Sequence, residues 1–129
     1  MQLSDKTEKV IKIIFPEEKW KYVREIIIER LLSPYPNCCN TEQISLSVLK
    51  YSRGQIDRLL IGIEEGAKDF RDLIVSAYFA TDIDSHINWA DQVIKKKILF
   101  SSVITSLIRH SGQVTLLSNG VCLLHQNLN

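Results

Sequence analysis

The sequence of residues 55–77 is QIDRLLIGIEEGAKDFRDLIVSA, and one hydrophobic pattern occurs in it twice. In each half, apolar residues stand at positions i, i+3, i+4 and i+7, a spacing that places them on one face of an α-helix. Gly66 predicts the end of the first helix, and Asp69 predicts the cap of the second. The apolar faces are Ile56, Leu59, Leu60 and Ile63 in the first helix, and Phe70, Leu73, Ile74 and Ala77 in the second.

Three further helices are predicted before this segment, over about 4–15, 16–32 and 41–51. Pro16 ends the first of them, because the residue before a proline avoids the α conformation. A loop rich in proline and asparagine is expected over 33–40. The predicted starts are Asp5, which with Glu8 resembles a capping pair, then Pro16 itself, and Thr41; the inward residues are Trp20, Val23, Ile27 and Leu31, then Ile44, Val48 and Leu49.

A sixth helix is predicted over about 84–96, after which the pattern weakens. Residues 98–109 can form a helix with Leu99, Val103 and Leu107 on one side, although serine and threonine lower its propensity. Beyond Gly112, two apolar runs flank Asn119-Gly120, the typical centre of a β-hairpin. The sequence leaves two alternatives open here, a hairpin over about 114–124 or a disordered tail.

The predicted fold is therefore all-α, an irregular bundle of five to seven short helices. Residues 1–96 are expected to form the helical domain, and residues 97–129 a C-terminal extension packed on it. A chain of this length buries roughly two-thirds of its unfolded surface, enough for a core without metals or disulfides. The predicted core includes Trp20, Val23, Ile27, Leu59, Ile63, Phe70, Leu73, Ile74 and Ile87.

Composition narrows the classes of function. The 16 lysines and arginines nearly balance the 15 acidic residues, so the net charge of +1 does not point to nucleic acid or to anionic membranes, although a local patch stays open. Apolar runs such as Ile26-Ile27-Ile28 are far shorter than the roughly 18 residues that span a bilayer. The N-terminus does not resemble a signal peptide. The odd cysteine count, Cys38, Cys39 and Cys122, predicts a reducing, cytoplasmic location.

Several short motifs together resemble a group of small uncharacterised bacterial helical proteins. Phe15-Pro16 opens one helix, and Asp69-Phe70-Arg71-Asp72-Leu73 opens another with the pattern Asp-aromatic-Arg-Asp-Leu. Phe79-Ala80, His86 and Trp89 follow at a similar spacing. The resemblance covers about residues 10–95 and implies an all-α fold and a bacterial source. It implies no activity, and the chain after Lys97 does not belong to the pattern.

The densest polar cluster is Asp69-Phe70-Arg71-Asp72. One interpretation makes Arg71 a binder of anions, with Asp69 or Asp72 as a base. The simpler interpretation is structural, because a helix start needs acidic residues whatever the protein does. Asp69 then caps the helix, Asp72 meets free backbone amides, and Arg71 pairs with an acid elsewhere, such as Glu64 or Glu65.

A second cluster is formed by His86, Trp89 and Asp91. A histidine near carboxylates suits acid–base chemistry, but no nucleophile or paired-ligand spacing accompanies it. The simpler interpretation places Trp89 in the core or at an interface and His86 in a solvated or capped first helical turn.

Metal, nucleotide and DNA sites have little support. Cys38 and Cys39 with Cys122 and His125 could supply zinc ligands, but adjacent cysteines lack the usual ligand spacing. No glycine-rich phosphate loop is present. Residues 44–63 resemble a helix-turn-helix in which Gln55 and Arg58 suit DNA, whereas Asp57, Glu64 and Glu65 would repel phosphates. We expect no metal and no cofactor.

The sequence thus favours a non-enzymatic module that binds another protein or a second copy of itself. Apolar residues outside the main helix faces support this prediction, since helices that are apolar on two sides contact more than their own core. The alternatives are a small hydrolase or lyase that uses His86 with the acidic cluster, and a helix-turn-helix DNA binder. The apolar residues off the main faces are Tyr22, Ile28, Ile61, Val75 and Phe79, and the catalytic candidates are His86 with Asp69, Arg71 and Asp72.

Overall fold

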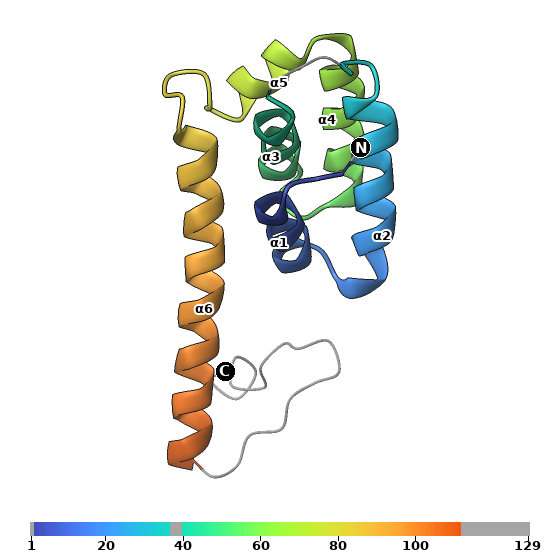
Figure 1. The fold of residues 1–129 in the computed structure, drawn as a ribbon. Helices are drawn as coiled ribbons and strands as arrows, with labels where there is room; N and C mark the ends of the chain where they lie inside the picture. Colours follow the sequence, from blue (N-terminus) through green and yellow to red (C-terminus); the bar gives the residue numbers. More distant parts are fainter. Residues whose placement is uncertain (1, 37–39, 112–129) are drawn as a thin grey trace. The chain divides into compact units, whose positions relative to one another are not determined.

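The computed structural model describes residues 2–36 and 40–111 of the chain, with side chains up to Thr105 (Figure 1). Within these residues the chain forms helices joined by short connections and contains no strand, which confirms the predicted all-α fold. The elements are α1 (Asp5–Ile14), α2 (Glu17–Ile26), the π-helical turn η1 (Ile27–Leu32), α3 (Thr41–Ser52), α4 (Ile56–Lys68), α5 (Phe70–Ser76) and α6 (Ser85–Ser111).

The start of α1 differs from the prediction. Ser4, rather than Asp5, is the N-cap, and its hydroxyl accepts the amide of Thr7 at 3.2 Å. Glu8 does not complete a capping pair, because its carboxylate binds Arg24 of α2. Serine is as good a cap as aspartate, and the ion pair gives Glu8 a stronger partner than a helix start offers.

The helix predicted over 16–32 is present, but it widens at its end. In η1 the amide of Ser33 donates to the carbonyl of Ile28 at 2.9 Å, five residues back. The wider turn directs Ile27, Leu31 and Leu32 inward together, and all three are at most 1% exposed. The π-turn therefore buries one more leucine than a regular α-helix with a single inward stripe would.

Helix α3 is the centre of the bundle, in contact with α1, η1, α4 and α5 (Figure 1). The predicted inward residues Ile44, Val48 and Leu49 are fully buried, and so is Leu46, which lies outside their stripe. Three serines of α3 are buried as well. Their hydroxyls donate to backbone carbonyls in the same helix: Ser45 to Thr41, Ser47 to Gln43 and Ser52 to Leu49, at 2.6–2.7 Å.

Two glycines position α4. Arg53 and Gly54 adopt left-handed backbone conformations in the turn before α4, with φ of 51° and 74°. Gly66 does not end α4 as predicted, because the helix continues to Lys68. A Cβ at Gly66 would lie 2.7 Å from Leu31, so this glycine is needed for close packing instead.

The C-terminal part also differs from the prediction. The two helices expected over 84–96 and 98–109 form the single helix α6, since no glycine or proline interrupts it and lysine is a good helix former. Phe79, predicted to lie off the main faces, is 2% exposed and belongs to the core. Ile87, predicted in the core, is only half-buried, as are Trp20 and Phe70, which pack against the core from its edge.

The chain divides into two units, Met1–Ile94 and Lys95 onwards, so that α6 begins in the first and continues into the second. The hairpin predicted over about 114–124 lies outside the described residues, as do Cys38, Cys39, Cys122 and His125. None of the helices in the described ranges combines the length and apolar character needed to cross a bilayer.

Replacing Gly54 by alanine is expected to lower the free energy of unfolding by about 1–3 kcal/mol. The substitution strains a left-handed backbone and brings a Cβ to 2.6 Å from the carbonyl oxygen of Ile14. Gly66→Ala is the matched control and should cost less, because its Cβ meets only leucine methyl groups and alanine favours a helix. Urea unfolding measures both; a larger loss for Gly66→Ala would contradict this account.

Candidate functional site

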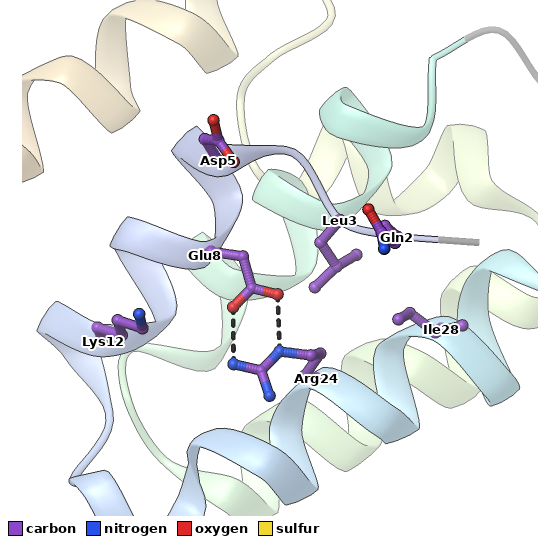
Figure 2. A pocket seen from close by; sticks show the side chains of 7 residues that line it. All are labelled: Gln2, Leu3, Asp5, Glu8, Lys12, Arg24 and Ile28. Atoms are coloured by element: carbon purple, nitrogen blue, oxygen red, sulfur yellow. Dashed lines mark hydrogen bonds and ion pairs between the residues drawn. The ribbon is translucent and has the colours of Figure 1, made fainter.

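In the first unit, two grooves are lined entirely by residues that the structure describes. One lies between α1 and α2 and has a volume of about 490 Å³ (Figure 2). This α1–α2 groove falls within the roughly 300–1,000 Å³ that small-molecule sites occupy. It is lined by Gln2, Leu3, Asp5, Glu8, Lys12, Arg24 and Ile28.

An ion pair dominates the α1–α2 groove. Arg24 donates to both carboxylate oxygens of Glu8, at 2.7 and 2.8 Å, and Figure 2 shows the two side chains face to face. The hydrogen-bonded carboxylate raises the pKa of Arg24 above its ordinary value. Because each charge satisfies the other, the pair fastens α1 to α2 and is itself not free to bind an ionic ligand.

The second groove, here named the corner groove, lies where the chain passes from α5 to α6 and has a volume of about 240 Å³. Residues from three places form it: α3, the α5–α6 connection and the first turns of α6. They are Lys50, Tyr78, Phe79, Asp82, Ser85, Asn88, Trp89 and Gln92. Trp89, a binding residue predicted from the sequence, thus lines a groove.

Lys50 joins α3 to the corner. Its ammonium group donates to the carbonyl of Ala77 at 2.8 Å, which places a cation at the negative end of α5. The same nitrogen lies 4.8 Å from the ring centre of Phe79 and 5.5 Å from that of Tyr78. Among the ion pairs of the described residues, none involves Lys50.

Tyr78 has an unusual backbone. Helix α5 ends in a Schellman motif, with the amide of Phe79 bonded to Ile74 and that of Tyr78 to Val75, each at 3.0 Å. Tyr78 occupies the left-handed position, with φ of 63°, where glycine is the usual residue. Its side chain is 80% exposed, so no burial offsets the strain, which for such residues is about 1–3 kcal/mol.

The contacts of Asp69 in the acidic cluster stabilise the start of α5. Asp69 accepts the amide of Arg71 at 3.0 Å, which confirms the predicted cap. The guanidinium of Arg71 pairs with Asp69, and not with Glu64 or Glu65 as predicted, because the nearer carboxylate is already in place. These bonds lower the pKa of Asp69 and raise that of Arg71. Asp72 is exposed.

His86 is buried, contrary to the prediction of a solvated or capped side chain. It is 8% exposed, and its Nδ1 has no hydrogen-bond partner among the described residues. Its ring centre lies 6.2 Å from that of Phe79. Asp91, expected nearby as an acid, pairs instead with Lys6 at 2.7 Å.

Neither groove is lined by His86 or by the acidic cluster of α5, so the geometry adds no support to the hydrolase alternative. The helix-turn-helix alternative gains none either. Arg58, the basic residue that suited DNA, donates to the carbonyl of Tyr51 at 3.0 Å and lies over the ring of that tyrosine. In the described ranges, no group of three or more histidine, cysteine or acidic residues is placed to hold a metal.

Sequence reasoning missed both Lys50 and Tyr78. Lys50 lies 27 residues before its carbonyl partner, and no local pattern links the two. The left-handed position of Tyr78 carries no glycine or asparagine that would have indicated it. No sequence signal indicated the reversal of the chain at Tyr78, since Phe79, which this reversal buries, was itself predicted to lie off the main faces.

The Glu8–Arg24 pair gives a stability prediction. Glu8→Gln is expected to lower the free energy of unfolding by about 1 kcal/mol, since the bidentate contact is lost in a half-buried place. Glu25→Gln is the matched control, because Glu25 meets Lys21 only at 3.9 Å on the exposed surface. Its cost should stay below about 0.5 kcal/mol. Equal losses in urea unfolding would refute the special role of the Glu8–Arg24 pair.

No family model, no curated protein and no solved structure matches this chain. The resemblance to small bacterial helical proteins therefore stays a prediction, and the function has to be inferred from the geometry of the molecule itself.

Proposed function

We propose that this protein is a non-enzymatic interaction module that binds a second copy of itself through the α5–α6 corner. The corner surface consists of the exposed side chains of Val75, Tyr78 and Ile83 together with the corner groove. The three side chains are 59%, 80% and 82% exposed. Large exposed apolar side chains close together in the sequence are consistent with a protein-binding surface.

The left-handed Tyr78 is the observation that carries the proposal. A tyrosine at the position where glycine is least strained, with its ring in solvent, is costly for the fold. The contact of its ring with Lys50 at 5.5 Å is worth only about 0.5–1 kcal/mol at an exposed site, so we infer that the side chain also serves a partner. Tyrosine and tryptophan are also the residue types most enriched among the energetically dominant residues of interfaces, and Trp89 lines the same groove.

The size of the groove favours a protein partner over a small molecule. At about 240 Å³ it is smaller than most small-molecule sites. The exposed Tyr78 lines it, so that a partner can fill the groove with one side chain and cover this ring at the same time.

The corner surface carries the features that a self-complementary patch needs, which supports a second copy as the partner. A twofold contact places the same patch against itself, so the patch must carry both a projection and a hollow. Ile83, which follows the groove residue Asp82 in the chain, is 82% exposed and can supply the projection. Lys50 and Asp82 both line the groove, so each cation of one copy can meet an anion of the other. Because an odd number of cysteines suits a reducing compartment, we propose that the protein acts in the cytoplasm.

Tyr78→Gly is expected to separate stability from association. The free energy of unfolding of this variant should be about 1 kcal/mol higher than that of the wild type, because glycine relieves the left-handed strain. Its dimer should be at least about tenfold weaker, because a central aromatic side chain is lost. Light scattering across a concentration series measures association, and urea unfolding measures stability.

Two further variants sharpen this experiment. Ile83→Asp changes a side chain that is 82% exposed and should abolish the dimer without affecting the fold. Tyr22→Ala removes an exposed tyrosine of α2 and should leave the dimer intact. A wild-type chain that stays monomeric at all concentrations would rule out the proposal, and so would a Tyr78→Gly variant that dimerises as the wild type does.

A further inference from the structure

The acidic and basic residues are distributed unevenly along the chain. All 15 acidic residues lie at or before Asp91, together with 12 of the 16 lysines and arginines. The 38 residues after Asp91 contain Lys95, Lys96, Lys97 and Arg109 and no acid. The net charge of +1 therefore conceals an acidic body and a basic C-terminal part.

The second unit begins with this basic cluster and continues with an exposed apolar face. Lys95, Lys96 and Lys97 are exposed on α6. Leu99, Phe100 and Val103 follow on one side of the helix, at the spacing i, i+1 and i+4, and are 55–56% exposed. Ile98, on the other side, is also 61% exposed.

The opposite side of this helical segment carries hydroxyl groups beside Ile98. Ser101, Ser102 and Thr105 occupy it, and all three are exposed. The hydroxyl of Thr105 donates to the carbonyl of Ser101 at 2.9 Å within the helix. The segment thus has an apolar side and a side rich in hydroxyl groups, with three lysines gathered at its start.

We propose that α6 from Lys95 to Ser111 lies in the surface of an anionic lipid bilayer, with Leu99, Phe100 and Val103 inserted among the lipids. A basic amphipathic helix with bulky apolar residues binds membranes in this way. Lysines at its start attract anionic headgroups and can extend their long side chains to the interface. The 17 residues span only about 25 Å, which suits a helix lying on a bilayer rather than crossing it.

Two other partners fit this segment less well. Pairing with the same helix of a second copy would bring basic residues together with no acid to compensate them. An acidic protein would be expected to meet cations distributed along the helix, whereas three of the four basic residues here stand together at positions 95–97. The proposal goes beyond self-association at the corner, because it uses a different surface in the other unit.

The test uses the full chain and vesicles of phosphatidylcholine with and without phosphatidylserine. Co-sedimentation should show binding to the vesicles that contain phosphatidylserine, weakened at least about tenfold without that lipid or in high salt. The triple variant Lys95→Gln, Lys96→Gln, Lys97→Gln should lose at least about tenfold in affinity. The control Lys9→Gln, Lys19→Gln, Lys68→Gln removes as many exposed lysines from the body and should bind as the wild type does.

Insertion is tested separately from electrostatic adsorption. Phe100→Trp should shift its emission to shorter wavelength on the phosphatidylserine vesicles, and Phe100→Ser should bind at least about tenfold more weakly, since a large buried apolar group is lost. Absence of binding by the wild type, an unshifted Phe100→Trp, or equal binding by the two triple variants would overturn the proposal. So would capture by soluble polyglutamate without any binding to vesicles, which would indicate an acidic protein partner.

The variant Tyr78→Gly separates lipid binding from self-association. Tyr78→Gly should bind the vesicles like the wild type even where it no longer forms a dimer, because the corner surface takes no part in lipid binding.

Discussion

The bundle depends on the burial of α3. This helix contacts α1, η1, α4 and α5, and its buried residues lie on more than one face. Such burial is favourable only when the polar groups that accompany it find partners. The hydroxyl groups of the three buried serines find their partners within the helix, because each donates to a carbonyl three or four residues earlier. Their small size also lets the neighbouring helices approach closely.

This central position explains which parts of the fold could be predicted from the sequence. Helices α4 and α5 lie at the edge of the bundle and show the pattern of one apolar face, so their inward residues followed from spacing. The pattern fails for α3, since a helix buried on several sides needs serine as well as leucine inside. It also fails at Gly66, where the contact that requires a glycine comes from Leu31, a residue far away in the sequence.

The residues of the corner groove could likewise be predicted only in part. Trp89 was expected at an interface or in the core because it is a large residue beside a helical stripe, and it lines the corner groove. Lys50 and Tyr78 were not expected, because one acts through a distant carbonyl and the other through a backbone angle that its residue type does not suggest. Contacts of this kind arise only when the helices have packed.

The two proposed surfaces share one physical property. Each contains a residue whose conformation or exposure lowers the stability of the isolated fold. Most helix ends and apolar faces in the described residues are the ones that packing favours, as at Asp69 and along α4. Tyr78 is strained with its ring in solvent, and Phe100 exposes an aromatic ring on a helix whose serines and threonines weaken it. Departures that lower stability, in a chain that is otherwise locally consistent, are the observations on which both proposals rest.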